Sequence, residues 1–308
     1  MDFGVKKYYN LNINMSCKNK TKLTFIDLFA GIGGFHLAFH KNGAECVFAS
    51  EWNDYSRKTY ETNFNKISPA IFKNGNFVGD ITNVEPKNIP DFDIICGGFP
   101  CQPFSQAGFK KGFQDERGNL FFHIAEIIKT KKPKAFFLEN VRHLFKHDDG
   151  KTFATIKKVI ENYLGYSFYY KIVKGTDFNV PQHRPRLFMV GFKNKKIPFN
   201  FPEPVKLTKT MSDIFGASCE KKIGYTLRVG GRGSVITDRR NWDSYKVDGK
   251  IVRLGVEEGK KMMGLPSNYV FPVSNSQAMK QLGNAVVVPA ISVVAKEIIN
   301  TLNKHYAD

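Results

Sequence analysis

Short apolar segments alternate with helical segments from residue 23 to about residue 192, and this alternation limits the fold more than any other feature. The apolar runs that we interpret as strands lie at 23–29, 45–50, 77–80, 92–96, 135–140 and 188–192. Helices are expected from the first glycine turn to about residue 43, and at 53–63, 120–130 and 152–164. Strands separated by helices form βαβ units, which predicts an α/β fold with a doubly wound, mostly parallel sheet.

The character of the chain changes near residue 193. Residues 193–250 contain 13 Lys and Arg against 6 Asp and Glu, with many Gly, Pro and aromatic residues and no clear helical period. A helical pattern returns at 256–263 and beyond residue 286, where one face carries Val287, Ile291, Val294 and Ile298. We expect a mobile N-terminal tail at 1–22, a large domain at 23–192, a smaller loop-rich domain at 193–279, and a C-terminal segment at 280–308 that packs back on the large domain.

The composition indicates a globular protein with an anionic partner. A hydrophobic content of 42% fits a well-buried core rather than a disordered chain. A net charge of +18 indicates nucleic acid first and a membrane surface second, but no long apolar stretch or basic amphipathic helix supports a membrane. The five cysteines form no Cys-x-x-Cys pair, and residues 1–22 lack a signal-peptide core. We therefore expect a cytoplasmic protein without a disulfide framework or a zinc site.

One cysteine lies in an unusual loop. Residues 97–108 read Gly-Gly-Phe-Pro-Cys-Gln-Pro-Phe-Ser-Gln-Ala-Gly and follow the strand expected at 92–96. Pro100 fixes the backbone before Cys101, and Pro103 prevents a regular helix from beginning at once. The thiol is thus presented at the carboxyl end of a strand, where open α/β sheets bind ligands. Cys101 is a candidate nucleophile, whereas the common alternative for a free cysteine is a buried structural thiol.

A second candidate site is the glycine turn after the first strand, Asp-Leu-Phe-Ala-Gly-Ile-Gly-Gly-Phe at 27–35. Its glycines let the backbone approach a ligand at the amino terminus of a helix, which favours an anionic group. His36 occupies the last glycine position of a dinucleotide fingerprint, which weakens a dehydrogenase interpretation. Glu51 ends the second strand, where a carboxylate can accept hydrogen bonds from ribose hydroxyls, and the neighbouring Trp52 offers a face for stacking on adenine.

Five motifs occur together in this chain. They are the glycine turn, the Pro-Cys-Gln loop, Phe-Leu-Glu-Asn-Val at 137–141, Gln-His-Arg-Pro-Arg at 182–186 and Gln-Leu-Gly-Asn-Ala-Val at 281–286. With these motifs in order from about residue 24 to 290, the chain resembles the DNA (cytosine-5) methyltransferases of bacterial and phage restriction-modification systems. The resemblance implies the Rossmann-like fold of S-adenosylmethionine-dependent methyltransferases, with a catalytic and cofactor-binding domain at 23–192 and a target recognition domain at 193–279.

The resemblance also implies the catalytic residues. Cytosine carbon 5 is a poor nucleophile, and a thiolate that adds to carbon 6 makes carbon 5 able to attack a sulfonium methyl group. By resemblance, Cys101 is that nucleophile and Glu139 holds ring nitrogen 3 and the exocyclic amine. Arg186 is expected at the cytosine carbonyl and Arg184 in a more supportive place, the alternative for both being phosphate contact or a solvated pair. Glu139 alone could equally be a helix cap or an ion-pair partner.

The donor implied by the resemblance is S-adenosylmethionine, with no metal. Asp80 would accept a hydrogen bond from the adenine amine, while Phe29 and Ile81 would pack near the adenine ring. Simple core packing is an equal alternative for the apolar members of this set. The positions expected to contact the donor are Phe29, Gly31, Gly33, Gly34, Glu51, Trp52, Asp80, Ile81, Pro100, Leu120 and Asn284. His143 and His147 have the spacing of metal ligands, but the sequence offers no third ligand.

The expected substrate is double-stranded DNA from which the target cytosine is flipped. The basic residues would supply phosphate contacts, and an arginine can bridge two guanine acceptors in the major groove. The resemblance makes Arg232, in a glycine-rich loop, the candidate DNA-invading side chain, with ordinary solvated charge as the alternative. The residues predicted to contact DNA are Gln102, Ser105, Arg228, Arg232, Arg239 and Arg240.

Two other functions are compatible with the same fold. One is an RNA cytosine-5 methyltransferase, which the sizeable basic domain and the lack of a Cys-Phe-Thr signature disfavour. The other is a non-catalytic DNA-binding relative, which the presence of Cys101, Glu139 and the glycine turn disfavours. We expect a monomer, with a cognate restriction endonuclease acting on the same site as a functional rather than a stable partner.

Overall fold

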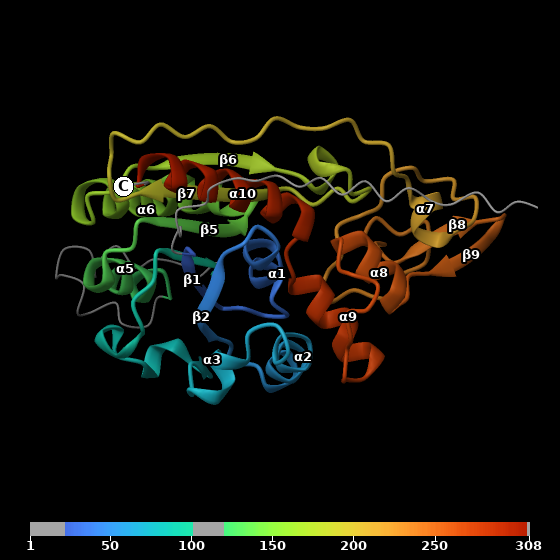
Figure 1. Ribbon diagram of the computed structural model, residues 1–308. Coiled ribbons are helices and arrows are strands. Elements are labelled where there is room, and N and C mark those ends of the chain that lie inside the picture. The colour runs from blue at the N-terminus through green and yellow to red at the C-terminus, as the bar shows by residue number, and fades with distance from the viewer. Residues whose placement is uncertain (1–21, 101–119, 307–308) are drawn as a thin grey trace, which may run out of the picture.

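The computed structural model describes residues 22–100 and 120–306. Its centre is a seven-stranded sheet in the order β3-β2-β1-β4-β5-β7-β6 (Figure 1). The strands are β1 (Thr24–Leu28), β2 (Glu45–Ser50), β3 (Phe77–Val78), β4 (Ile94–Gly98), β5 (Ala135–Val141), β6 (Tyr169–Val173) and β7 (Arg186–Phe192). The pairs among β1 to β5 are parallel, and β7 is antiparallel to both β5 and β6. The expected mostly parallel, doubly wound sheet is confirmed.

The central strands are apolar because both faces of the sheet are covered. Neighbouring residues of one strand enter different hydrophobic clusters: Phe25 and Phe137 pack on one side, Ile26 and Phe136 on the other. At the junction of β1 and β4, a Cβ on Gly97 would lie 2.3 Å from the carbonyl oxygen of Leu28. Only glycine lets the two strands approach this closely, directly before the loop that leads to the predicted nucleophile.

Helices cover the two faces of the sheet. The helices that follow β1 and β2 are α1 (Gly34–Lys41), α2 (Asp54–Phe64) and α3 (Pro69–Lys73). On the opposite side α5 (Leu120–Lys131) and α6 (Lys151–Lys158) pack, with α6 continuing as one π-helical turn at Val159–Tyr163. The C-terminal helix α10 (Val288–His305) lies along α1 (Figure 1). The four apolar residues predicted on its inner face are buried.

The chain after β7 first runs extended across the sheet and then forms a separate, loop-rich part (Figure 1). This part contains α7 (Met211–Phe215), a hairpin of β8 (Ser244–Val247) and β9 (Lys250–Arg253), and α8 (Val256–Met263). The helix predicted at 256–263 is confirmed. Helix α9 (Asn275–Asn284) spans the expected division at 279/280 and leads through a short turn into α10. The loop-rich part is therefore joined to the large part at α9 as well as at residue 193.

Several elements differ from the sequence prediction. Strand β3 is shorter than expected because the Asp80 side chain accepts from the Thr82 backbone amide and begins a 3₁₀ turn at Ile81. Strand β6 and helices α3 and α9 were not predicted. Within the described ranges, no single helix is long and apolar enough to cross a membrane; only α9 and α10 taken together pass that test, across a 42° bend.

Candidate active site and DNA interface

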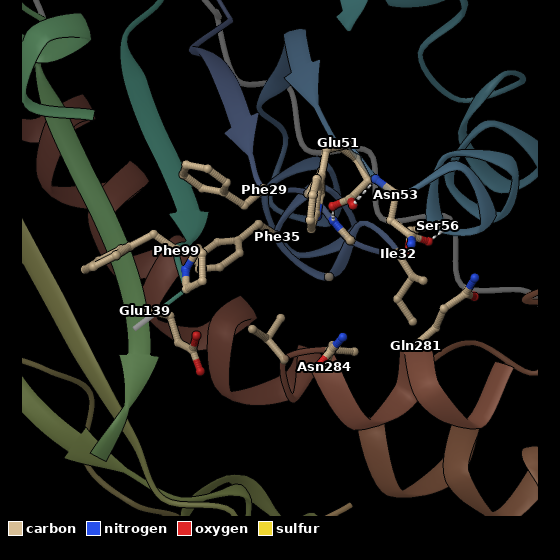
Figure 2. A pocket seen from close by; sticks show the side chains of 18 of the residues that line it. Phe29, Ile32, Phe35, Glu51, Asn53, Ser56, Phe99, Glu139, Gln281 and Asn284 are labelled. Atoms are coloured by element: carbon tan, nitrogen blue, oxygen red, sulfur yellow. Dashed lines mark hydrogen bonds between the residues drawn. The ribbon is translucent and has the colours of Figure 1, made fainter. Parts of the chain in front are cut away.

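A cavity of about 760 Å³ opens at the carboxyl ends of the parallel strands (Figure 2). Its walls come from the glycine turn after β1, from the ends of β2, β4 and β5, and from the turn between α9 and α10. The volume lies in the range of small-molecule sites, and this edge is where doubly wound sheets bind ligands. Among the predicted site residues, the lining includes Phe29, Gly31, Gly34, Glu51, Trp52, Asp80, Ile81, Pro100, Leu120, Glu139, Arg184, Arg186 and Asn284.

Glu51 is fixed by backbone amides at the centre of one wall. Its two carboxylate oxygens accept hydrogen bonds from the amides of Gly31 and Asn53, both at 2.8 Å (Figure 2). The residue is 7% exposed, and burial raises the pKa of its carboxyl while these amides lower it. The glycine turn that supplies one amide has left-handed backbone at Phe29 and Gly31. The turn and the acid therefore form one rigid unit, which presents a carboxylate to the cavity.

The remaining predicted donor residues surround this unit. Trp52 is 78% exposed beside the opening, Asp80 lies at its rim, and Ile81 is buried. Gly33 is the one predicted glycine that is not part of the lining. It supports the turn from behind, since its φ is +77° and a Cβ there would lie 2.2 Å from the Phe64 ring. Its role is to shape the turn, which sequence reasoning did not separate from ligand contact.

The cavity has properties that fit an adenosyl sulfonium donor. Three buried polar atoms of its lining, Ser50 Oγ, Arg184 Nε and Gln281 Nε2, have no hydrogen-bond partner among the described residues. Helix α1 begins at the glycine turn, and its N-cap residue Gly33 has no side chain to cap the first amides. Phe29, Phe35 and Phe99 supply apolar surface (Figure 2). A ligand with an apolar ring, ribose hydroxyls and a carboxylate would satisfy each of these features.

A second cluster of groups lies at the end of β5. Arg186 begins β7, which pairs with β5, and its Nε lies 2.9 Å from Glu139 Oε1. Burial raises the pKa of the Glu139 carboxyl, and the nearby positive charges of Arg186 and Arg184 oppose that rise. Antiparallel pairing of β5 with β7 thus places two residues 47 positions apart in direct contact. A buried carboxyl balanced in this way can hold or release a proton.

Two further buried residues shape the same region. The Asn140 amide donates to the carbonyl of Phe99 at 2.8 Å and so ties the end of β5 to the loop after β4. The Arg184 guanidinium, 2% exposed, donates to three backbone carbonyls and, among the described residues, contacts no carboxylate. Asn140 belongs to the Phe-Leu-Glu-Asn-Val motif, but the sequence does not predict this contact. The carbonyl that accepts its hydrogen bond lies 41 residues away in the chain.

Comparison with known proteins identifies the chain. The family model for C-5 cytosine-specific DNA methylases matches residues 23–229 and 222–300. The chain belongs to this family. It is 42% identical to the Type II methyltransferase M.SsoII of Shigella sonnei, covering 90% of this chain and 80% of that protein. It is also 38% identical to M.HhaI of Haemophilus parahaemolyticus, covering 94% of this chain and 98% of that protein.

Solved structures support the same fold. The S. pombe Dnmt2 methyltransferase superimposes with a TM-score of 0.69 at 18% identity, covering 92% of this chain and all of that one. With the family shown, this methylase transfers a methyl group from S-adenosylmethionine to carbon 5 of cytosine in DNA. The cavity, the Glu51 unit and the Glu139–Arg186 pair are therefore features of a DNA cytosine methylase.

Three predicted residues of the methylase lie outside the described residues: Cys101, Gln102 and Ser105. Pro100, the residue directly before Cys101, lines the cavity. Three other cysteines, Cys46, Cys96 and Cys219, are free and buried. In the part of the chain that the structure describes, no group of three or more His, Cys, Asp or Glu is arranged to hold a metal.

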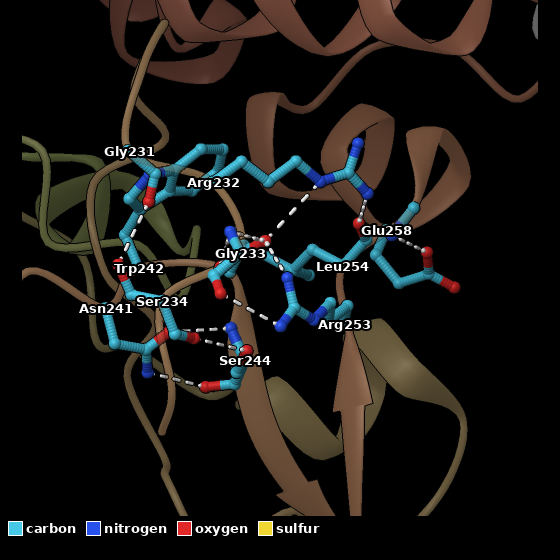
Figure 3. A network of polar contacts seen from close by, with 12 residues as sticks. Gly231, Arg232, Gly233, Ser234, Asn241, Trp242, Ser244, Arg253, Leu254 and Glu258 are labelled. Carbon is cyan, nitrogen blue, oxygen red and sulfur yellow. Dashed lines mark hydrogen bonds and ion pairs between the residues drawn. The ribbon is translucent and has the colours of Figure 1, made fainter. Parts of the chain in front are cut away.

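The predicted DNA-contacting arginines of the methylase fall into two pairs. Arg228 and Arg239 are exposed, and their side chains form no hydrogen bond or ion pair with other described residues. Arg240 is paired with Asp238 at 2.7 Å. Arg232 is exposed but is held by two contacts within the loop-rich part: its Nη2 donates to the carbonyl of Leu254 at 2.7 Å, and its Nε lies 3.4 Å from the fully buried Asp243 (Figure 3).

Asp243 and Trp242 hold the loop around Arg232 in place. Asp243 also accepts from the amide of Gly233 and faces Arg253, while the indole of Trp242 donates to the carbonyl of Gly230 (Figure 3). Asp243 and Trp242 were not predicted as functional. In the sequence these two residues appear only as a Trp-Asp pair before the strand at 244–247. Their contacts depend on how the loop folds, so the sequence does not predict them.

Proposed function

We propose that this methylase forms a transient bond between the sulfur of Cys101 and carbon 6 of a cytosine turned out of the duplex. Addition of the thiolate makes carbon 5 nucleophilic, and a base inside the stack would hide carbon 6 from any side chain. The observation that carries this proposal is the shared cavity: Glu139, Arg186 and Pro100, which precedes Cys101, line the same space as Glu51. A base and a methyl donor would meet there.

Glu139 and Arg186 are proposed to hold the flipped base. A protonated Glu139 carboxyl would donate to ring nitrogen 3 as the thiolate adds, and burial favours that protonated form. Arg186, already 2.9 Å from Glu139, would donate to the cytosine carbonyl. Arg184 is proposed as a positioning residue rather than a catalytic one, because its hydrogen bonds go to backbone carbonyls.

The donor would be held by the opposite wall. Bound S-adenosylmethionine supplies an electrophilic methyl group on a sulfonium. Glu51 would accept from the ribose hydroxyls, Trp52 would stack on the adenine and Asp80 would accept from its amine, with Phe29 and Ile81 beside the ring. Gly31, Gly34, Pro100, Leu120 and Asn284 would complete the contact surface.

The loop-rich part is proposed to recognise a specific double-stranded sequence. Arg228 and Arg239, exposed and unpaired within the described part of the chain, are the arginines best placed to contact phosphates or bases. We propose the division into a catalytic domain at 23–192, a recognition domain at 193–279 and a C-terminal segment at 280–308, with α9 as the connecting helix. As in a restriction-modification system, the protein would act in the cytoplasm as a monomer, beside a nuclease specific for the same site.

The experiment that tests this function is bisulfite sequencing of duplex DNA after incubation with the purified protein and S-adenosylmethionine. We expect conversion-resistant cytosines at one repeated sequence. A parallel incubation with RNA of the same sequence tests the alternative substrate. Methylation of RNA alone would reject the DNA assignment of the recognition part.

The covalent step has its own test. The duplex would carry 5-fluorocytosine at the target position and be incubated with S-adenosylmethionine. After methyl transfer, loss of the carbon 5 proton normally releases the sulfur; fluorine at that position prevents this release, so the adduct should persist on a denaturing gel. The Cys101→Ser variant should form no adduct and lose at least 1,000-fold in methyl transfer, on the order of the loss expected for a missing nucleophile. A serine variant that keeps full activity would contradict the proposal.

A further inference from the structure

Within residues 22–100 and 120–306, no carboxylate is in contact with the buried guanidinium of Arg184. It is 2% exposed, and burial lowers its pKa to about 9, with the positive charge of Arg186 acting in the same direction. The nearby carboxyl of Glu139 forms its ion pair with Arg186 instead. A buried charge is costly unless its donors are satisfied, so the carbonyl oxygens that surround Arg184 require explanation.

These carbonyls belong to two segments that are distant in sequence. Nη1 donates to Leu227 at 2.8 Å, directly before the exposed Arg228. Nη2 donates to Gly283 at 2.8 Å and to Ala285 at 2.6 Å. The second and third acceptors flank Asn284 in the turn that lines the donor cavity. One planar guanidinium thus joins the end of α9, which lines the donor cavity, to residues 227–229, where the glycine-rich loop around Arg232 begins.

The same two segments also touch directly. A Cβ on Gly283 would lie 2.6 Å from the carbonyl of Arg228 and 2.8 Å from the amide of Val229, so only glycine allows this approach. Residues 181–183 pair with Gly224, three residues before Leu227. His183 donates its amide to the Gly224 carbonyl, and the Gly224 amide donates to the Pro181 carbonyl. The position of Arg228 is therefore fixed by two contacts, with Gly283 at the end of α9 and through the pairing of Gly224 with residues 181–183.

We propose that Arg184 is a positioning residue that couples occupancy of the donor cavity to engagement of DNA by the segment at 227–229. A ligand that contacts Asn284 would hold the end of α9 at 283–285 in one position, and the guanidinium would transmit that position to the Leu227 carbonyl and the adjoining Arg228. Lysine cannot replace it, because an ammonium lacks the planar fork that reaches both segments. The inference rests on the proposed donor cavity and recognition segment.

Coupling of this kind is reciprocal and can be measured on the unmodified protein. The affinity for a duplex carrying the site found by bisulfite sequencing would be measured with and without S-adenosylhomocysteine, and the affinity for S-adenosylhomocysteine with and without that duplex. We expect both affinities to rise by the same factor, at least about fivefold. If both ligands bind but independently, this inference is overturned and the proposed function stands. If neither binds, the proposed function itself fails.

Two variants assign the coupling to this contact. Arg184→Lys removes the bridging fork, and Gly283→Ala pushes the segment away from α9 while it keeps the arginine. In each folded variant the coupling factor should fall below about twofold. Gly230→Ala is the matched control, because a Cβ there meets nothing within 4 Å, and it should keep the wild-type factor. Should Arg184→Lys not fold, Gly283→Ala decides; a wild-type factor in Gly283→Ala overturns the inference.

Discussion

At the scale of single residues, the protonation of Glu139 is set by two opposing influences. Burial raises the pKa of this carboxyl, whereas Arg186, whose Nε lies 2.9 Å away, lowers it. The rise is the larger effect, so the carboxyl keeps its proton to a higher pH than an exposed glutamate would. The raised pKa favours the protonated form that would donate to ring nitrogen 3.

The pH dependence of methyl transfer should reveal this proton. As pH rises through the raised pKa of Glu139, the protonated form and its contribution to the rate are lost. Glu139→Gln has no such proton, and we expect its single-turnover rate to be about 100- to 10,000-fold lower near neutral pH. The ratio of wild-type to variant rates should decline as pH increases, measured with tritiated S-adenosylmethionine. A ratio that is flat between pH 5 and 9 would exclude Glu139 as the proton donor.

Asp27 presents a buried acid of a different kind. The residue is fully buried, and burial raises its pKa well above the usual range, while the backbone amide of His36 acts in the opposite direction. The folded protein therefore holds a proton that the unfolded chain loses above about pH 4. Stability from this group is complete below that pH and is lost as pH rises toward the folded-state pKa.

Replacing Asp27 by Asn should remove that loss. Relative to wild type, the free energy of unfolding of Asp27→Asn should improve with pH by up to about 1.4 kcal/mol per unit across the affected range. Urea denaturation of both proteins at pH 5 and pH 8 gives the comparison, with His36 and the other titrating groups common to both. A difference between variant and wild type that is the same at the two pH values would show that Asp27 is ionised in the folded state.

At the scale of elements, the donor cavity depends on how closely α1 approaches the turn between α9 and α10. A Cβ on Gly34, the first residue of α1, would lie 2.4 Å from the Cγ2 of Val286. Extra atoms in a packed interface force neighbouring groups to shift at a cost of about 1–3 kcal/mol. The groups that must shift here belong to the turn that carries Asn284.

We expect Gly34→Ala to weaken binding of S-adenosylhomocysteine about tenfold, the lower part of that cost. The quenching of tryptophan fluorescence, dominated by the exposed Trp52 at the cavity, would report the affinity. Gly230→Ala serves as the control, since its added methyl meets open space. If Gly34→Ala binds as tightly as wild type, the turn at 284–286 does not form part of the donor site.

The elements that the sequence predicted are those with strong local signals. Strands β1, β4 and β5 are continuous apolar runs because both sides of them are buried, and α8 is bounded by glycines. Strand β6 is an edge strand whose residues are only half-buried, so it lacked that pattern. The contacts of Arg184 depend on acceptors 43 to 101 residues away, which no local pattern encodes.

At the scale of the whole molecule, the 46 Lys and Arg residues divide into those paired with carboxylates within the protein and those left for contacts with DNA. In the recognition part, Arg232 and Arg240 are paired with Asp243 and Asp238. Arg228 and Arg239 have no such partner within the described ranges. Removing Arg240 would leave the Asp238 carboxylate without its ion pair, whereas removing an unpaired arginine only loses a phosphate contact.

These two kinds of arginine should respond differently to salt. Each phosphate contact adds roughly 0.9 to the magnitude of the slope of log affinity against log salt concentration, because binding releases the counterion of that phosphate. We expect Arg239→Ala to reduce the magnitude of the slope by about one when affinity for a non-target duplex is measured between 50 and 200 mM NaCl. Arg240→Ala should leave the slope unchanged if its guanidinium stays with Asp238 in the complex. Equal slopes for wild type and Arg239→Ala would mean that the recognition part faces DNA through a different surface, and the assignment of Arg228 would fall with it.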